Sequence, residues 1–302
     1  NTTSSDTYIE TTSSDKVTSH LKGDVRTSDQ DSIPYLSMET SGDTLLIEVK
    51  RKQNHVFFYS SNIDFYVSIP EKYDGNIEYV SSSGNLEISD ATLDNLTIKL
   101  TSGDINIQDI DLKNKFDLSS TSGNSNISKL NANSMSYQST SGDRNFRNIT
   151  IKEDIDINST SGRTQLYDIT CNQLSIDSTS GDINIGDTKL DLLIIGSRSG
   201  TINVEDLDGG TQIETTSGYT KLSFSNANDN IYVKSLSGNV DIILPDNLGF
   251  TLNSKTTSGD IDCEFSLTNM KTGKHSLSGV YGNGEVDISI SVTSGDINIK
   301  ED

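Results

Sequence analysis

The chain has 302 residues, of which 31% are hydrophobic, and it contains three prolines and no tryptophan. This composition is thin material for a wide globular core, so it favours an extended fold with a narrow interior. The 44 acidic and 23 basic residues give a formal net charge of −21, which repels the phosphate backbone and argues against a nucleic-acid partner.

Residues 1–15 are rich in serine and threonine, and we expect them to form a flexible start. The sequence begins without an initiator methionine or a signal-like segment, and no apolar run is long enough to cross a membrane. The start therefore resembles a tether, which leaves an anchor upstream of this fragment as an expectation.

Residues 16–68 contain three short apolar runs. These runs lie at 45–49, 56–59 and 65–69. Between Gly42 and Gly84 the chain lacks the Ser-Gly pair that recurs about every twenty residues from Gly84 onward and marks a corner of each predicted solenoid turn. A solenoid needs capped ends because open strand edges invite pairing, so we expect an N-terminal β cap here. Thr40-Ser41-Gly42-Asp43 leaves a second interpretation open, in which enlarged solenoid turns begin at Gly42.

Residues 69–302 carry a repeat of about twenty residues, marked by Ser-Gly. From Gly84 to Gly259 the steps are 18 to 21 residues long. A large apolar residue lies four positions after nearly every glycine, as at Ile88, and another lies five positions before, as at Ile98. Alternation within such short segments indicates strands, and the repeat is too short to include a helix. The sequence predicts an all-β, single-stranded parallel β-helix.

Small polar residues line the predicted corners. Glycine supplies the backbone turn, and we expect the serine before it, and the serine two positions earlier, to point inward as stacked hydroxyl ladders. The second set comprises Ser81, Ser120, Ser139, Ser159, Ser178, Ser197 and Ser235. The residues just after glycine alternate between acids and other types, which keeps like charges apart on adjacent turns. These are Asp104, Asn124, Asp143, Arg163 and Asp182. The run that includes Asn106 and Asn126 suits an amide ladder.

The period fails again near residues 260–284, where the Gly-rich stretch 279–284 interrupts it. Pro70 and Pro245 each precede a corner glycine by fourteen residues, which suggests that one local strand geometry is used twice, in two linked halves. Since the regular turns are explained by packing, any localised function is expected where the repeat fails, in residues 16–80 and 260–284.

The heptapeptide Thr-Ser-Gly-Asp-Ile-Asn-Ile recurs at 101–107, 179–185 and 293–299, and 281–288 reads Tyr-Gly-Asn-Gly-Glu-Val-Asp-Ile. With these motifs the chain, from about residue 40 to its end, resembles the bacterial "putative adhesin" family of β-helix domains, whose function is uncharacterised. The resemblance implies a single-stranded β-helix at the cell envelope or outside the cell. It supplies no catalytic residue.

No catalytic, cofactor or metal site can be assembled from the sequence. The histidines His20, His55 and His275 are dispersed, and Cys171 and Cys263 lie too many turns apart for a disulfide. Abundant oxygen ligands leave calcium as the one metal to consider, but no calcium-binding motif is present. The basic cluster Lys50-Arg51-Lys52 with His55 is interpreted as a solvated hairpin end rather than an anion site.

We therefore expect a non-catalytic bacterial surface or envelope protein, an adhesin-like module that binds an unidentified glycan or protein. One alternative is a β-helix enzyme that degrades polysaccharides, which requires acids beside Lys271, Lys274 and His275 in a cleft. Another is a structural accessory protein of the envelope stress response. Ice binding is not expected, because the outward row Thr101, Thr121, Thr140, Thr160 and Thr179 has no parallel second row.

Overall fold

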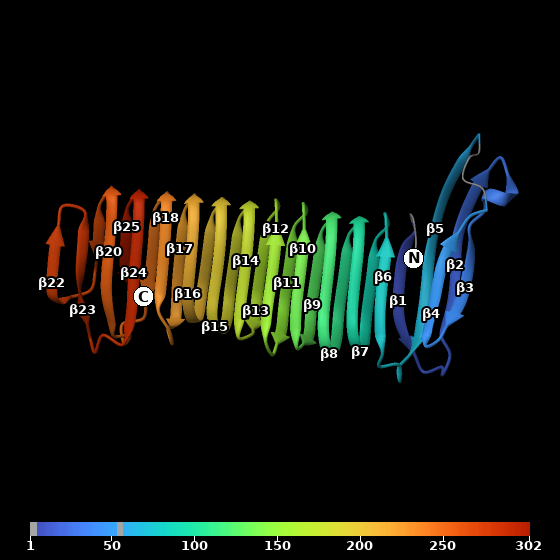
Figure 1. The fold of residues 1–302 in the computed structure, drawn as a ribbon, viewed down its shortest axis with the longest axis horizontal. Coiled ribbons are helices and arrows are strands. Elements are labelled where there is room, and N and C mark those ends of the chain that lie inside the picture. Colours follow the sequence, from blue (N-terminus) through green and yellow to red (C-terminus); the bar gives the residue numbers. More distant parts are fainter. Residues whose placement is uncertain (1–4, 53–56) are drawn as a thin grey trace. The chain divides into compact units, whose positions relative to one another are not determined.

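The computed structural model describes residues 5–52 and 57–302, and the chain divides into two compact units, Asn1–Ala132 and Asn133–Asp302. The described residues contain strands and one 3-10 turn but no α-helix. They therefore include no helix that is long and apolar enough to cross a membrane. Within each unit most strands pair in parallel with the strand one repeat away (Figure 1). The predicted all-β solenoid is confirmed.

The described residues of the first unit form nine strands, with η1 (Gln30–Ser32) between the second and third. They are β1 (Asp6–Thr12), β2 (Thr18–Thr27), β3 (Tyr35–Ser41), β4 (Thr44–Lys50), β5 (Tyr59–Pro70), β6 (Asn76–Ser81), β7 (Leu86–Ser102), β8 (Ile105–Ser122) and β9 (Ser125–Ala132). β7, β8 and β9 pair in parallel and form the regular turns, with β6 parallel to the second half of β7. β2 and β5 are antiparallel, and β3 and β4 form a separate hairpin.

The second unit continues the repeat with sixteen strands. They are β10 (Ser134–Ser139), β11 (Arg144–Ile151), β12 (Asp154–Ser159), β13 (Thr164–Thr170), β14 (Gln173–Ser180), β15 (Ile183–Ser199), β16 (Ile202–Ser217), β17 (Thr220–Asn226), β18 (Ile231–Ser237), β19 (Val240–Leu244), β20 (Phe250–Ser258), β21 (Ile261–Cys263), β22 (Thr268–Gly273), β23 (Ser276–Tyr281), β24 (Val286–Ser294) and β25 (Ile297–Glu301). The strands are parallel except for β22 and β23, which pair antiparallel with each other, and β23 also pairs antiparallel with β20.

The beginning of the chain is not wholly a tether. β1 lies between β5 and β7, with Ile9 opposite both Val67 and Ile88. Ile9 and Thr7 are buried, and Tyr79 donates a hydrogen bond to the Thr7 hydroxyl at 3.1 Å. The expectation of a flexible segment over residues 1–15 is therefore wrong for β1, because its alternating side chains fill the interior. Residues 1–4 lie outside the described part of the chain.

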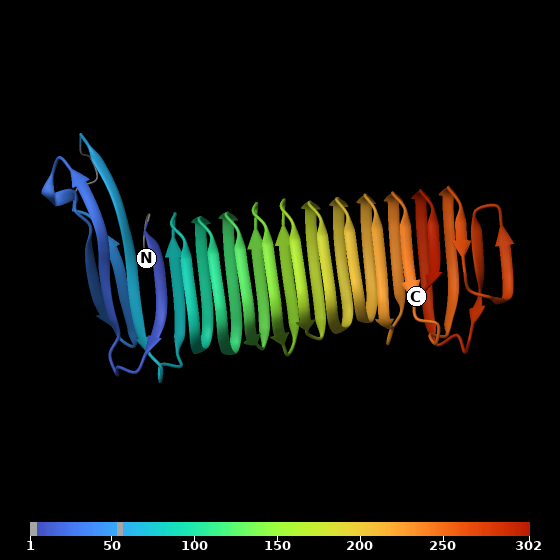
Figure 2. The same ribbon diagram turned by 180° about the vertical axis from the view of Figure 1, so that it is seen from behind.

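A second strand insertion occurs in the other unit. β24 pairs with β18 on one side and with β20 on the other, and β25 lies in the same way between β19 and β21. Both views show β24 and β25, in dark red, between orange strands that precede them in sequence (Figures 1 and 2). Order along the chain therefore departs from order in the stack. The twenty-residue period could not reveal this, because it is the same in either order.

The core positions follow the sequence prediction closely. Ten of the eleven residues four positions after a corner glycine are buried; the exception is Cys263, which is only partly covered. The residues five positions before the glycine are also buried, including Ser254, whose hydroxyl donates to the Leu277 carbonyl at 2.9 Å. At roughly 1.5–3 kcal/mol for each large apolar side chain removed from water, this repeated burial is the main stabilising term of each turn.

The corner glycines are required by close backbone stacking. Gly103 has φ +132°, and a Cβ added there would lie 2.7 Å from the carbonyl carbon of Gly84. The turns that begin at Gly84 to Gly200 bend a second time six residues after the glycine, at non-glycine residues with φ between 48° and 56°. These are Asp90, Asp109, Lys129, Asn148, Asp168, Asp187 and Asp206. Six of the seven are aspartate or asparagine, the residues that tolerate this conformation best after glycine.

Only one of the two predicted serine ladders points inward. Ser81, Ser120, Ser139, Ser159, Ser178, Ser197 and Ser235 are buried as predicted. The serines just before the glycines instead lie at the rim, where several donate to a carbonyl of the preceding turn, as Ser161 does to Thr140 at 3.3 Å. The inward prediction is wrong for this second set, because the chain has already begun to turn at the corner.

The residue after each corner glycine also links adjacent turns. The side-chain oxygen of Asn85 accepts the backbone N–H of Asp104 at 2.8 Å, and Asp104 in turn accepts the N–H of Asn124 at 2.7 Å. In the second unit, Asp143 and Asp182 accept from Arg163 and Thr201 in the same way. Aspartate and asparagine recur here because both carry a suitable acceptor. The predicted amide ladder is formed where Asn126 donates to Asn106 at 2.9 Å.

Candidate interaction surface

The two segments where the repeat fails form caps. In the first unit, β2 pairs antiparallel with β5 from Thr18↔Ser68 to Thr27↔Tyr59, and the β3–β4 hairpin lies beside them (Figure 1). Gly42 lies in the turn of this hairpin with φ +58° and is not a solenoid corner. The antiparallel pairing of β2 with β5 and the separate hairpin agree with the interpretation of these residues as an N-terminal β cap, and Gly42 does not serve as the corner of an enlarged solenoid turn.

The β3–β4 hairpin has one apolar face and one polar face. Leu36, Met38, Leu45, Ile47 and Val49 alternate onto the apolar face through the pairs Leu36↔Val49, Met38↔Ile47 and Thr40↔Leu45. β2 covers part of this face, where the Ser19 hydroxyl lies 3.8 Å from the Met38 sulfur. Met38 nevertheless remains 49% exposed and Leu45 40% exposed.

Exposed large hydrophobic residues gather on this cap. Of the eleven such side chains among the described residues, seven belong to residues 33–58. They are Ile33, Tyr35, Met38, Leu45, Leu46, Phe57 and Phe58. Single exposed apolar residues are ordinary, whereas contiguous apolar patches mark interaction surfaces. Met38 and Leu45 share the apolar face of the hairpin, while Leu46 lies on its polar face. We call residues 16–58 the N-terminal cap and these seven residues the cap apolar cluster.

The charge of the N-terminal cap differs from that of the rest of the chain. Residues 16–58 contain six basic residues (Lys16, Lys22, Arg26, Lys50, Arg51 and Lys52) and six acidic ones (Asp24, Asp29, Asp31, Glu39, Asp43 and Glu48), so their formal charge is 6 − 6 = 0. The remaining residues therefore carry the whole formal net charge of −21. A partner that approaches the cap meets apolar surface without the strong acidic field of the other turns.

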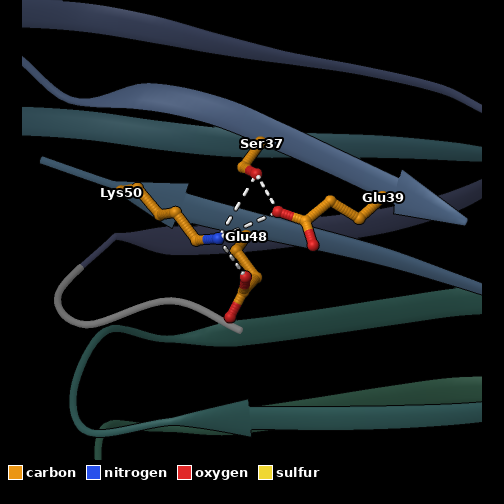
Figure 3. Close-up of polar contacts among 4 residues, drawn as sticks. All are labelled: Ser37, Glu39, Glu48 and Lys50. Carbon is orange, nitrogen blue, oxygen red and sulfur yellow. Dashed lines mark hydrogen bonds and ion pairs between the residues drawn. The ribbon is translucent and has the colours of Figure 1, made fainter.

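Three cationic residues at the end of the hairpin, Lys50, Arg51 and Lys52, have partners among the described residues. Lys50 lies on the polar face of the hairpin, with its Nζ 2.7 Å from Glu48, 3.4 Å from Glu39 and 3.3 Å from the Ser37 hydroxyl (Figure 3). The hydrogen bond with Glu48 raises the pKa of Lys50 above its ordinary value. Because the group is exposed, this cluster orders the hairpin face and contributes little stability.

The neighbouring cations are also engaged. The Lys52 ammonium lies 3.6 Å from Asp31, and the Arg51 guanidinium lies 4.5 Å from the centre of the Tyr59 ring. The interpretation of Lys50-Arg51-Lys52 as a solvated hairpin end, rather than an anion site, agrees with these contacts. His55, which was assigned to the same cluster, lies outside the described residues.

Three rings stack across β1, β5 and β2, a feature that sequence reasoning missed. Tyr66 of β5 lies between Tyr8 of β1 and His20 of β2, with ring centroids 4.9 Å apart on each side and interplanar angles of 13° and 9°. The residues are 46 and 58 positions apart in the sequence, and only the pairing of β1, β5 and β2 aligns them. No periodic signal could have revealed this stack.

The other irregular segment closes the interior of the second unit. Phe250, Phe265 and Tyr281 contact one another with ring centroids 4.8 to 5.5 Å apart, and Phe250 is fully buried. Lys271 lies on β22, whose side chains are all exposed, and Lys274 is exposed in the following turn. His275 Nδ1 lies 3.2 Å from the Gly259 carbonyl oxygen. These contacts place His275 in a structural role and offer no enclosed site around the lysines.

The two cysteines are free thiols. Burial raises the pKa of Cys171 to about 12, and burial also raises that of Cys263. A thiol with a raised pKa is protonated near neutrality and is a poor nucleophile or metal ligand. Among the residues that the structure describes, no group of three or more His, Cys, Asp or Glu side chains could hold a metal ion.

Comparison with known families identifies the fold. The model of the toastrack DUF4097 family matches this sequence twice, over residues 1–159 and 152–300. The chain belongs to this family. The resemblance to a bacterial β-helix family is thereby confirmed, and the double match fits the repeated geometry at Pro70 and Pro245. Each proline carbonyl accepts an N–H three residues later, from Tyr73 at 2.9 Å and from Leu248 at 3.1 Å.

Other comparisons add little to the toastrack assignment. A crystal structure from Clostridium sporogenes, described as a putative cell adhesion protein, matches all of this chain over 91% of its own length. Sequence identity is 11% and the TM-score is 0.17, so this match carries no argument about function. No curated protein matches the sequence.

Proposed function

We propose that this toastrack protein is a non-catalytic, adhesin-like interaction module of the bacterial surface or envelope, which contacts a protein partner through its N-terminal cap. The observation that carries the proposal is the cap apolar cluster, which gathers seven of the eleven exposed large hydrophobic residues of the described chain. The other four are Tyr73, Tyr219, Leu236 and Met270, which are far apart in the sequence.

The choice of a protein over a glycan rests on the chemistry of this surface. Met38 and Leu45 are flexible aliphatic side chains on the same face of the hairpin, which suit a complementary apolar protein surface. The cap is also electrically neutral, so it does not repel a partner of either sign. The stacked rings of Tyr8, Tyr66 and His20 turn their faces toward one another, which leaves Tyr66 no open face for a sugar ring.

The test compares three immobilised versions of the full chain. Met38→Glu with Leu45→Glu places charges on the half-exposed apolar face, whereas Leu236→Glu, at an exposed residue far away in sequence, is the matched control. We expect one envelope protein to be retained by the wild type and the control, to be lost with the double variant, and to bind again after purification. Equal retention by all three versions would refute a role of the cap.

Cell fractionation and enzyme assays test the remaining parts of the proposal. Antibody against the protein should detect it in the envelope or extracellular fraction of the producing cells; recovery in the cytoplasm would contradict the location. Cell-wall and extracellular polysaccharides incubated with the purified chain should release no reducing ends. Release that is abolished by substitution of an acid on the protein would favour the polysaccharide-degrading alternative.

A further inference from the structure

One long strand of the first unit has an edge without a partner. β5 pairs with β1 on one side and with β2 on the other, so β2 is the last strand of this sheet (Figure 1). All ten residues of β2 pair with β5, from Thr18↔Ser68 to Thr27↔Tyr59, and no other strand of the described residues pairs with them. The N–H and C=O groups of alternate β2 residues therefore point away from the sheet, without a backbone partner in the described part of the chain.

This edge lacks most of the features that prevent pairing between molecules. Natural edge strands are commonly short, bent by a bulge or interrupted by proline. β2 has ten residues, no proline and an unbroken register with β5. By contrast, β22 of the second unit, whose one ladder among the described residues is with β23, is interrupted by a register shift between Thr268 and Lys271. The edge of β2 is therefore suited to accept a further strand.

The sequence of β2 is complementary to itself about Gly23. When two copies of β2 are aligned antiparallel with Gly23 opposite Gly23, Lys22 of each copy lies opposite Asp24 of the other. In the same alignment Leu21 lies opposite Val25, and the two glycines leave the centre clear of side chains. Directly opposite side chains of an antiparallel pair interact, and both opposite charges and apolar pairs are stabilising. The charged and the apolar residues of β2 thus each find a complement in a second copy.

The two faces of β2 select this register over its neighbours. Leu21 and Val25 are half-buried on one face of the strand, whereas Lys22 and Asp24 are exposed on the other. A shift by one residue would place the apolar side chains opposite the exposed polar ones. A shift by two would place Lys22 opposite Lys22 or Asp24 opposite Asp24, and like charges in opposite positions are destabilising.

We propose that the protein forms a two-fold symmetric dimer in which β2 pairs antiparallel with β2 of a second copy, in the register centred on Gly23. The sheet β1–β5–β2 of one copy then continues into β2–β5–β1 of the other. Such an isologous contact occupies both open edges, so it closes at two copies. The inference concerns the edge of β2 and not the cap apolar cluster, so it goes beyond the proposed function and does not rest on it.

Size-exclusion chromatography with light scattering tests the dimer on the full chain from micromolar to millimolar concentration. The wild type should approach twice the mass of one chain as its concentration rises. Lys22→Asp and Asp24→Lys each place like charges opposite one another, so each alone should weaken the dimer about tenfold or more. Both residues are exposed. The control Lys16→Asp reverses an exposed charge just before β2 and should dimerise like the wild type.

An equimolar mixture of the two variants tests the register itself. In a mixed pair, the new carboxylate at position 22 lies opposite the new ammonium at position 24, and Asp24 of one chain lies opposite Lys22 of the other. The mixture should therefore regain the wild-type affinity, and so should a chain that carries both substitutions. The proposal is wrong if the wild type stays monomeric, if the single variants dimerise as well as the wild type, or if the mixture stays monomeric.

Hydrogen exchange on the wild type gives the same decision without any variant, should either substitution prevent folding. Backbone amides on the outer edge of residues 18–27 should exchange more slowly as the dimer forms, because they become hydrogen-bonded. Exchange in this segment that does not change with protein concentration would refute the pairing of β2.

Discussion

Substitution of a corner glycine gives a quantitative test of the stacking argument. In Gly103→Ala, the added methyl would meet the Gly84 carbonyl group, whose carbon is 2.7 Å away, and φ is +132°. Backbone strain destabilises the folded variant by about 1–3 kcal/mol, and steric overlap destabilises it by about a further 1–3 kcal/mol. The alanine also makes the unfolded chain less flexible, which offsets about 0.4–1 kcal/mol of this loss. We expect a net loss of about 3 kcal/mol in the free energy of unfolding.

The same unit provides a matched control. Gly42 also has a positive φ, of +58°, but a Cβ added there has no atom within 4 Å. Gly42→Ala should therefore cost only the left-handed backbone term of about 1–2 kcal/mol, less the unfolded-state gain.

Urea unfolding followed by far-UV circular dichroism measures both variants in the same transition. A loss for Gly103→Ala no greater than that for Gly42→Ala would refute the claim that backbone contact between turns selects glycine.

Three further predictions concern polar and titratable groups. Asp104→Asn should change stability little because an amide oxygen still accepts the Asn124 N–H, whereas Asp104→Ala should lose about 1 kcal/mol in urea unfolding; equal losses would exclude the side-chain link. Burial opposes ionisation of Asp241, but hydrogen bonds, including one from Tyr219 at 2.7 Å, lower its pKa overall. Ionised Asp241 therefore stabilises the fold above its unfolded-state pKa, and this stabilisation is lost as the pH falls through its folded-state pKa. Asp241→Asn should reduce the fall of the melting temperature at acid pH, and an unchanged fall would contradict this prediction. Cys171 should react with a maleimide only on unfolding, because its thiol is buried with a pKa raised to about 12; rapid labelling of the folded chain would show that it is accessible.

Sequence reasoning was most successful where a contact depends on the repeat. The apolar positions on either side of each glycine, such as Ile88 and Ile98, were assigned to the core correctly because their burial follows from strand alternation. The second corner was visible in the sequence, as aspartate or asparagine six residues after glycine, but was overlooked. Its backbone conformation is the one these residues favour, so this signal could have been used.

The cap could be located but not described in detail. Absence of the repeat indicated residues 16–68, yet the pairing of Tyr8, Tyr66 and His20 depends on which strands become neighbours. Such neighbours are far apart in sequence, and alternation alone fits many registers. The burial of Arg144 was missed for another reason: an arginine two residues after a corner looks like an outward residue until the inward parity of that position is compared across turns.

The position of β24 and β25 has a consequence for biosynthesis. The ribosome releases β18 and β20 before β24, yet β24 must lie between them in the native sheet. Turns up to β18 can stack as they emerge, but the edge of β18, which ends at Ser237, must then stay unpaired with β20 until 57 further residues, to Ser294 at the end of β24, have been translated (294 − 237 = 57). Premature pairing of β18 with β20 is the error that this order invites. The turn formed by β24 and β25, the last in the sequence, is therefore inserted between neighbours that have already been translated.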